Sequence, residues 1–182
     1  MTVQVRRPVE PEWERWRDLR LQMLADTPEA YAETLETART LDEAEWRFRV
    51  RRTWLPGSFT VVGVEEAGGP ADRWVGTMGA YTDPVEGVFL VSVFVDPAHR
   101  GGGLADRLLS EVLTWARTAA GASGVKLHVH ERNVRAQAFY RRRGFVENGV
   151  RVPYVLDAAE EELEMELLFE RPPAIVPGAG PA

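Results

Sequence analysis

A glycine-rich turn joins an apolar run to an amphipathic segment, and this junction constrains the fold more than any other part of the chain. The run extends from Val88 to Val95, the turn is Arg100-Gly101-Gly102-Gly103-Leu104-Ala105, and the amphipathic segment ends at Gly121. This order indicates a strand that passes through a tight turn into a helix. Free backbone N–H groups and the positive dipole end at a helix start bind anions. The junction therefore predicts an α/β arrangement with a phosphate-binding turn.

Two common phosphate-binding loops do not fit this spacing. A Walker loop ends in Gly-Lys-Ser/Thr, whereas this turn continues as Leu104-Ala105-Asp106. A dinucleotide fingerprint lies early in a βαβ unit, and an acidic residue about 20 positions later binds a ribose. Here the turn lies past the middle of the chain and no acidic residue clearly fills that position. Nucleoside triphosphates and dinucleotides are therefore disfavoured as ligands.

A second group of residues follows the amphipathic segment. Apolar and polar residues alternate from Val125 to His130, which predicts a strand with one apolar side. The chain then continues through Asn133, Ala136, Phe139-Tyr140 and Arg143-Gly144-Phe145. Each position has an ordinary structural explanation, because asparagine caps helices, phenylalanine anchors a core and glycine ends a helix. Their order and their distance from the first motif carry more information than any one residue.

Together the two motifs resemble those of the GCN5-related N-acetyltransferase (GNAT) family. Arg100, Gly103 and Ala105 match its R-x-x-G-x-A signature, which binds the pyrophosphate of acetyl-coenzyme A. The second block is similar to the strand and short helix whose asparagine, alanine and tyrosine meet the pantetheine arm and the sulfur. The resemblance is close over residues 88–145 and only a matter of pattern elsewhere. It implies acetyl-coenzyme A as cosubstrate, no metal, and a coenzyme site formed by Val93, Phe94, Val95, Arg100, Gly101, Gly102, Gly103, Leu104, Ala105, Asn133, Ala136 and Tyr140.

The resemblance also implies catalytic roles. Acetyl transfer from a thioester to an amine requires a neutral amine, a stabilised oxyanion and a proton for the departing sulfur. The chain has no cysteine, which excludes an acyl-cysteine intermediate and leaves direct attack in a ternary complex as the simplest route. Tyr140 matches the family's tyrosine near the sulfur and is expected to protonate it. Backbone groups around Phe94 are expected to bind the pantetheine amides and to stabilise the oxyanion.

His128 is the candidate for the general base. It lies on the polar side of its strand, twelve positions before Tyr140. Family members that acetylate protein N-termini have a glutamate at the matching position. An imidazole with an ordinary pKa of about 6.5 can accept a proton from an ammonium group at neutral pH. His130, Glu86 and Asp83 are alternatives.

Basic residues near the two motifs have two interpretations. The run Arg141-Arg142-Arg143 could pair with coenzyme phosphates, but arginines in the last helical turn also complement the negative end of the helix dipole. The second interpretation is favoured for the run. His99 is predicted to be a loop residue exposed to water.

The periodicity of the remaining chain predicts a single domain over residues 1–170 and a disordered tail over 171–182. The predicted strands are Thr2–Arg7, Phe59–Glu65, Arg73–Tyr81, Val88–Val95, Val125–His130 and Glu162–Phe169. The predicted helices are Pro11–Asp26, Leu41–Thr53, a helix from Leu104 to the stop at Gly121, and a short helix after Asn133, with a loop over Tyr31–Thr40 and a hairpin connection at 67–70. This order favours an α/β (α+β) fold, with a mixed, mostly antiparallel sheet of about six or seven strands between helices. The family resemblance adds that Val88–Val95 and Val125–His130 are parallel and splay apart.

Composition limits the partners. The net charge of −6 disfavours nucleic acid and weakly favours cationic small molecules or basic peptides. No apolar run approaches 18 residues, and the first residues lack a signal peptide's apolar stretch, so no membrane association and a cytoplasmic location are expected.

The sequence therefore predicts an N-acetyltransferase that acts on a primary amine, either of a small molecule or of a peptide. A noncatalytic module of the same fold that binds an acyl-coenzyme A or a partner protein is the main alternative, and a nucleotide-binding regulatory domain is a second. In the resembled family, the first two helices and the loop around Tyr31 form one wall of the acceptor pocket. The last strand has an edge that would allow a homodimer.

Overall fold

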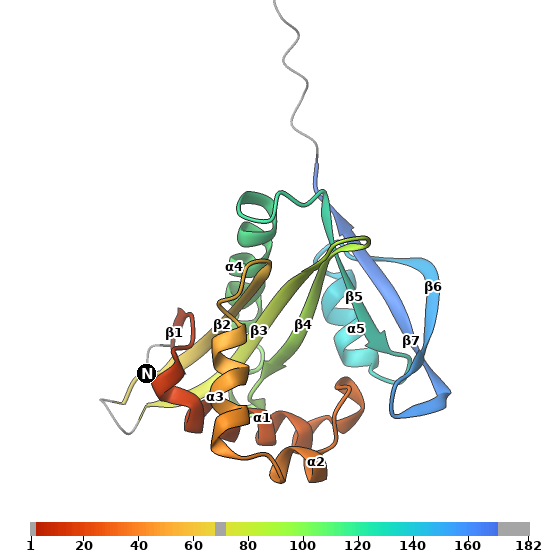
Figure 1. Cartoon of the computed structure of the whole chain (residues 1–182). Coiled ribbons are helices and arrows are strands. Elements are labelled where there is room, and N and C mark those ends of the chain that lie inside the picture. The colour runs from red at the N-terminus through yellow and green to blue at the C-terminus, as the bar shows by residue number, and fades with distance from the viewer. Residues whose placement is uncertain (1–2, 68–71, 171–182) are drawn as a thin grey trace, which may run out of the picture.

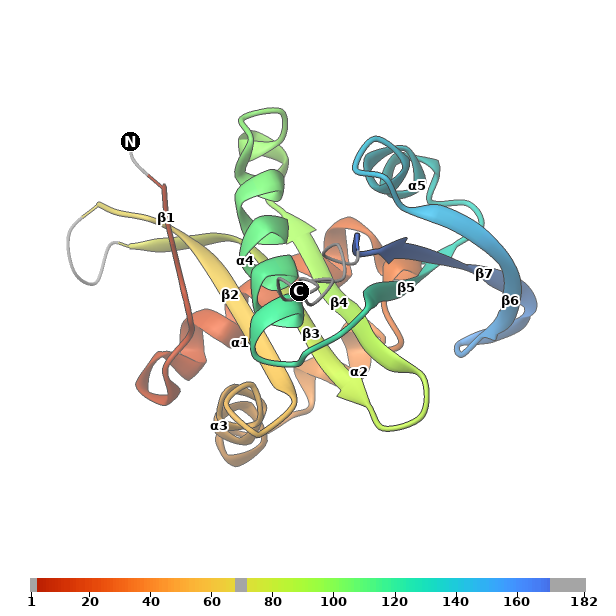
Figure 2. The same cartoon turned by 90° about the horizontal axis from the view of Figure 1, so that it is seen from above.

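Alternating apolar residues build a seven-stranded sheet in the computed structural model, which describes residues 3–67 and 72–170 (Figures 1 and 2). The strand order is β1-β2-β3-β4-β5-β7-β6, and only β4 and β5 pair in parallel. The strands are β1 (Val3–Arg6), β2 (Ser58–Glu65), β3 (Arg73–Asp83), β4 (Gly87–Val95), β5 (Gly124–His130), β6 (Val146–Tyr154) and β7 (Asp157–Leu168). The predicted mixed, mostly antiparallel sheet is confirmed.

Helices cover both faces of this sheet, as Figure 2 shows. They are α1 (Trp13–Asp26), α2 (Leu35–Arg39), α3 (Glu43–Arg52), α4 (Leu104–Thr118) and α5 (Val134–Arg141), with single 3-10 turns at Glu10–Glu12, Pro28–Ala30 and Pro97–His99. One core joins α4 and α5 to the sheet through residues such as Leu108, Leu127 and Phe145. A second core joins α1 and α3 to the other face around Trp46 and Phe94. Burial on both faces explains why β4 is almost continuously apolar.

Three elements differ from the sequence prediction. The segment predicted as a loop over residues 31–40 contains α2, whose start is capped by Thr34 accepting a hydrogen bond from Thr37 N. Strand β6 was not predicted at all, and β7 begins at Asp157, earlier than expected. β6 is an edge strand with Gly149 at φ 89° and Pro153 in its length, and most of its residues are exposed. An exposed edge lacks the one-sided alternation that marks a half-buried strand.

The central parallel strands separate along their length. β4 and β5 pair only at Val88 with Val125 and at Phe89 with Lys126, although both strands continue well beyond these positions. A bulge in β4 opposite the β3 register shift places Ser92 at φ 54°, which bends the strand. The structure thus contains the splay that the resemblance implied. The predicted tail at 171–182 and most of the predicted connection at 67–70 lie outside the described residues.

Candidate functional site

A cavity of about 630 Å³ lies where β4 and β5 separate. It is lined by parts of β4, β5, α5, the glycine-rich turn and the segment after α1. The sequence-predicted residues that line it are Val93, Phe94, Val95, Arg100, Gly101, Gly103, Ala105, His128, Asn133, Ala136 and Tyr140. The two motifs, which are separate in sequence, therefore contribute to the same cavity.

The glycine-rich turn presents unused backbone donors to this cavity. None of the N–H groups of residues 101–106 donates a hydrogen bond to another residue in the described part of the chain. Gly101 and Gly103 adopt backbone φ values of 80° and 79°, which residues other than glycine rarely adopt. A Cβ atom on either glycine would meet no atom within 4 Å. The turn is therefore an open row of N–H groups at the start of α4, suited to an anion.

Two of the predicted coenzyme residues do not line the cavity. Gly102 is exposed, and the Leu104 side chain is buried in the core. The Leu104 methyl groups lie 3.0 and 3.1 Å from the place where a Cβ on Gly63 would be, so this glycine lets α4 approach the sheet closely. Leu104 can offer a ligand only its backbone N–H group.

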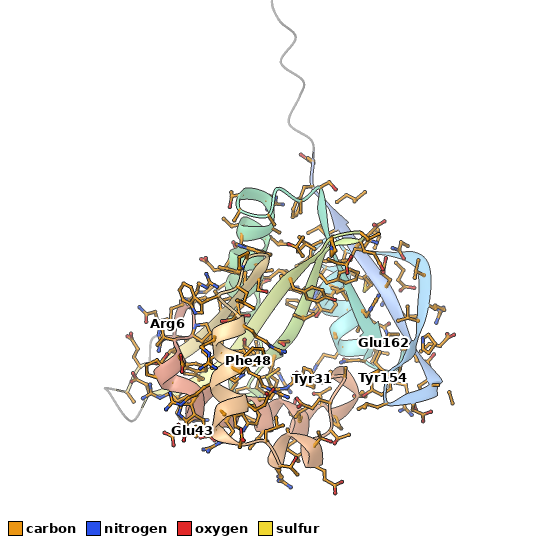
Figure 3. The ribbon with its side chains drawn as sticks, viewed as in Figure 1. Arg6, Tyr31, Glu43, Phe48, Tyr154 and Glu162 are labelled. Carbon is orange, nitrogen blue, oxygen red and sulfur yellow. The ribbon has the colours of Figure 1, made fainter. Side chains whose placement is uncertain are left out.

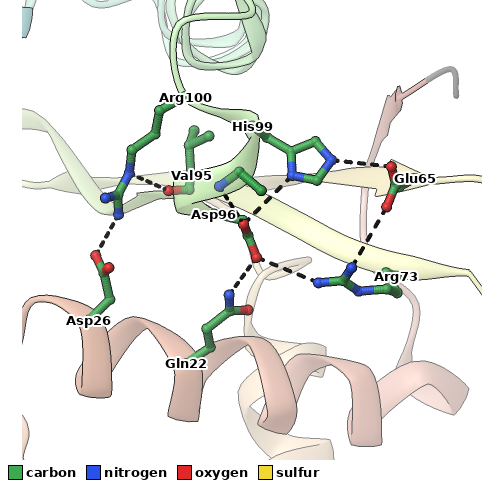
Figure 4. A network of polar contacts seen from close by, with 9 residues as sticks. Gln22, Asp26, Glu65, Arg73, Val95, Asp96, His99 and Arg100 are labelled. Carbon is green, nitrogen blue, oxygen red and sulfur yellow. Dashed lines mark hydrogen bonds and ion pairs between the residues drawn. The ribbon is translucent and has the colours of Figure 1, made fainter.

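Polar contacts anchor the turn to α1, as Figure 4 shows. The Arg100 Nε donates to the Val95 carbonyl oxygen at 2.9 Å, and its Nη2 pairs with Asp26 at the end of α1. Asp96 accepts hydrogen bonds from Ala98 N at 2.8 Å and from Gln22 Nε2 at 2.6 Å. Arg100 lines the cavity, but these two of its nitrogens already hold β4 and α1 together.

His99 is not the water-exposed loop residue predicted from the sequence. Its side chain is 18% exposed, and its Nε2 lies 3.3 Å from Glu65 Oε1 (Figure 4). Its Nδ1 is buried without a hydrogen bond and lies 3.7 Å from Asp96 Oδ1. The difference arises because the single 3-10 turn after β4 folds His99 back toward β2, an approach that no local pattern reveals.

Tyr140 lies in the core at the cavity wall. It is 5% exposed, and its ring packs against Phe139 and Phe145. Burial, with a smaller contribution from Tyr31, raises the pKa of the Tyr140 hydroxyl well above its ordinary range. No hydrogen bond joins this hydroxyl to any other described residue. The hydroxyl is therefore a protonated donor without a protein acceptor.

His128 of β5 lines the cavity, and its imidazole contacts a carboxylate of the neighbouring strand β7. Its Nε2 lies 3.1 Å from Glu164 Oε2, and its ring lies 5.4 Å from that of Phe89. Glu164 also contacts Lys126 Nζ at 3.3 Å and accepts from Asn148 Nδ2 at 2.6 Å. Burial alone would raise the pKa of Glu164, but these contacts outweigh it and lower that pKa. Glu164 thus stays charged and orients the imidazole.

The other histidine of β5 has no free ring nitrogen. His130 Nδ1 accepts from Arg132 N at 3.2 Å, and its Nε2 lies 2.8 Å from Glu160 Oε2. The His130 side chain is fully buried and stacks edge-on against Tyr154. Both nitrogens have protein partners, so His130 is a structural residue here rather than a base.

The two acidic alternatives lie elsewhere. Asp83 caps the turn between β3 and β4 by accepting hydrogen bonds from Val85 N at 2.8 Å and Glu86 N at 2.9 Å. Neither Asp83 nor Glu86 lines the cavity. Among the sequence-derived base candidates, His128 alone combines a place in the cavity with a ring nitrogen, Nδ1, that no described residue contacts.

Asn133 caps α5. Its Oδ1 accepts a hydrogen bond from Ala136 N at 3.1 Å, which is the ordinary N-cap contact. We expect Asn133→Ala to lower the free energy of unfolding by about 1 kcal/mol, because alanine cannot accept that bond. Asn133→Ser should restore most of the loss. Urea unfolding of the three proteins checks this, and equal stability of wild type and Asn133→Ala would show that the cap is dispensable.

The arginine run mostly makes structural contacts. Arg141 pairs with Glu147, and Arg143 pairs with Asp106 in the first turn of α4. The Arg143 guanidinium also lies 3.9 Å from the centre of the Phe139 ring. Arg142 and Arg143 both line the cavity, but the Arg142 side chain differs because it forms no hydrogen bond or ion pair with a described residue. The preferred structural interpretation holds for the first and third arginines only.

The segment after α1 closes one side of the cavity. The Tyr31 hydroxyl donates to the Val93 carbonyl oxygen at 3.0 Å, and the Tyr154 hydroxyl donates to the Tyr31 carbonyl oxygen at 2.9 Å. These bonds tie the segment to β4 and to β6. The Val93 carbonyl oxygen is thus already occupied by Tyr31.

The sequence analysis did not assign every lining residue to the site, and Glu162 is one that it missed. Glu162 of β7 lies in the cavity wall, where it pairs with His130 across the β5–β7 ladder. The sequence showed that Glu162 lies in an alternating strand, but it did not show β6, one of the two strands beside β7. In the described ranges, no helix is long and apolar enough to cross a membrane, and no three His, Cys, Asp or Glu residues gather as metal ligands.

Comparisons with known proteins agree with this geometry. Residues 16–145 match the model of the acetyltransferase (GNAT) family. The chain is 32% identical over 149 residues to the IAA acetyltransferase of Azospirillum brasilense, covering 82% of each protein. It is 30% identical over 140 residues to a mycothiol acetyltransferase of Salinispora arenicola, covering 76% of this chain and 43% of that protein.

The chain spans less than half the length of three curated relatives that it matches, including that mycothiol acetyltransferase. The fold also superposes on the PaiA N-acetyltransferase of Thermoplasma acidophilum, solved with coenzyme A, with a TM-score of 0.70 at 15% identity, covering 93% of this chain and 100% of that one. Because the family model covers well over half of the 182 residues and the fold agrees, the chain belongs to the acetyltransferase (GNAT) family.

Proposed function

We propose that this protein transfers an acetyl group from acetyl-coenzyme A to a primary amine by direct attack in a ternary complex. The observation that carries the proposal is the row of unused N–H groups at residues 101–106, beside a cavity that also receives the unpartnered hydroxyl of Tyr140. An anionic carrier that ends in a thioester requires both features. Membership of the family and the splay of β4 and β5 support the same reaction.

Different cavity residues would contact different parts of the coenzyme. Backbone N–H groups from Gly101 to Asp106 would bind the diphosphate, with Arg142 as the nearby free cation. Residues Val93, Phe94 and Val95 would line the pantetheine arm on one side, and Asn133 and Ala136 on the other. Acetyl-coenzyme A supplies the activated acyl group, and the chain supplies orientation and hydrogen bonds.

The chemistry then needs two proton movements. As the amine nitrogen attacks the thioester carbon and the C–S bond breaks, the departing sulfur acquires charge and takes up a proton, which the Tyr140 hydroxyl donates. The amine loses a proton to a base, for which His128 is the candidate. With its Nε2 hydrogen donated to Glu164, the His128 Nδ1 keeps a free lone pair.

Thiol release in the presence of a mixed amine panel tests the proposal. An acetyltransferase releases free coenzyme A only when an acceptor is present. A noncatalytic module would bind coenzyme A in calorimetry and release none with any amine. A nucleotide-binding domain would be stabilised against heat by ATP or NAD but not by coenzyme A.

We expect His128→Ala to lower kcat about tenfold or more near neutral pH, since general base catalysis contributes about 10²–10⁴-fold and water can partly substitute. Coenzyme A affinity should change little, because His128 lies on β5 and away from the glycine-rich turn. The measurement is the initial rate at saturating acceptor across about pH 6–9, in steps of about half a pH unit. An unchanged rate would remove His128 from the mechanism.

A further inference from the structure

Glu162 is a carboxylate in the cavity wall without a protein partner. It is partly buried and lines the cavity, and its side chain forms no hydrogen bond or ion pair with any described residue. Directly paired residues of neighbouring strands point to the same face of a sheet. Glu162 pairs with His130, and its neighbour Glu164 pairs with His128, so these side chains share one face. Burial, with a smaller contribution from Glu162, raises the pKa of the Tyr154 hydroxyl, and Figure 3 labels both residues.

The neighbouring carboxylates of β7 are all engaged. Glu160 contacts His130 and Arg132, Glu161 contacts Arg151, and Glu164 contacts His128 and Lys126, in the part of the chain that the structure describes. Asp106, the other carboxylate that lines the cavity, is paired with Arg143. Among the described residues of β7, Glu162 and Glu166 are thus the glutamates without a side-chain partner, and only Glu162 of the two lines the cavity.

An unpaired, partly buried carboxylate is costly. Burial raises the pKa of Glu162, and His128 and His130 offset this effect only in part. A cation beside Glu162 would stabilise the charged form and repay the lost hydration. None of the arginines that line the cavity pairs with Glu162 in the described residues: Arg20, Arg100, Arg135 and Arg143 have other acidic partners, and the exposed Arg142 has none.

Charge is therefore distributed unevenly around the cavity. Arg100, Arg142 and Arg143 lie around the glycine-rich turn and the end of α5, where an anionic carrier would bind. The wall formed by β5, β7 and the first half of β4 instead combines Glu162 with His128 and the aromatic ring of Phe89. A carboxylate beside aromatic rings is a suitable environment for an ammonium group.

We propose that Glu162 binds the ammonium group of the acceptor and makes the enzyme select amines that are cationic at neutral pH. This inference rests on the proposed acetyl transfer. The ammonium form docks against Glu162, and its proton passes to the imidazole of His128, the diagonal neighbour across the β5–β7 ladder. The neutral amine then attacks the thioester carbon, the C–S bond breaks, and the second proton that the nitrogen loses passes to the departing sulfur. Glu162 contacts substrate in this scheme, whereas Glu164 acts only through His128.

The test compares Glu162→Gln with Glu166→Gln. Both replacements remove one carboxylate from the same face of β7, but Glu166 does not line the cavity and has no ion pair or hydrogen bond with a described residue. Steady-state rates are measured with an aliphatic diamine and with an aromatic amine that is neutral at the assay pH. Coenzyme A affinity and thermal unfolding of each protein are recorded beside them.

Glu162→Gln should raise KM for the diamine about tenfold, the value of one hydrogen bond to a charged group, and leave KM for acetyl-coenzyme A unchanged. The preference for the diamine over the aromatic amine should fall by the same factor, and Glu166→Gln should match wild type. An unchanged diamine KM in a folded Glu162→Gln protein would overturn the inference alone. If wild type releases no thiol with any amine, the proposed function fails instead.

Discussion

A Tyr140→Phe protein should bind coenzyme A as tightly as wild type and turn over about 10²–10³ times more slowly, the usual effect of removing one hydrogen-bond donor from a developing anion. The replacement leaves the ring and its contacts with Phe139 and Phe145 in place. Burial raises the pKa of Tyr140, so wild type keeps its proton throughout the neutral range and can always donate. The relevant measurement is kcat at saturating acetyl-coenzyme A and amine.

The stability of this variant provides the control. No described residue accepts a hydrogen bond from the Tyr140 hydroxyl, so its loss should not destabilise the fold, and the urea midpoint should equal that of wild type. A wild-type kcat in Tyr140→Phe would show that the sulfur departs without this donor. Weaker coenzyme binding at unchanged kcat would instead make Tyr140 a packing residue beside the arm.

A Gly103→Ala protein should bind coenzyme A about 10–100 times more weakly, since each hydrogen bond to a charged group is worth about 1.5–3 kcal/mol. At φ 79° an L residue is strained, and relaxation of the turn would move the N–H groups that follow. The added Cβ would also occupy the open space beside those groups. Isothermal titration of coenzyme A into the purified variant gives the change in Kd.

Gly121→Ala is the matched control for this effect. Gly121 also has a positive φ, 62°, with no atom within 4 Å of an added Cβ, but it follows the far end of α4 and does not line the cavity. Both variants should lose about 1–2 kcal/mol of stability from the strained backbone. Only Gly103→Ala should lose coenzyme affinity. Equal Kd values for the two variants would remove the turn from the diphosphate site.

Local patterns predicted most of the framework. The alternation in β5, the helical spacing in α4 and the caps and glycine stops depend on residues within a few positions of one another. The sequence analysis placed these elements within a few residues of their observed bounds. It missed β6, since an exposed edge strand with a glycine and a proline has no one-sided pattern. It also read α2 as loop, although Thr34 is an N-cap residue.

The candidate site was predicted in part for the same reason. The two motifs are local, so the turn, Tyr140 and His128 could be identified before their meeting in one cavity was known. The partners of these residues could not be predicted from the sequence. Nothing in the sequence pairs Arg100 with Asp26, 74 positions away, or His128 with Glu164, 36 positions away.

The sequence by itself determined the kinds of element, the glycine-rich turn and the family to which they point. Among the described residues, the tertiary structure alone decided which histidine of β5 keeps a free ring nitrogen and which unpaired carboxylate faces the cavity. The physical reason is register: a shift of one residue between β5 and β7 would reverse the face to which every side chain of the shifted strand points. That register is set by long-range packing of both strands on the core, so His130 became structural and Glu162 was left facing the cavity.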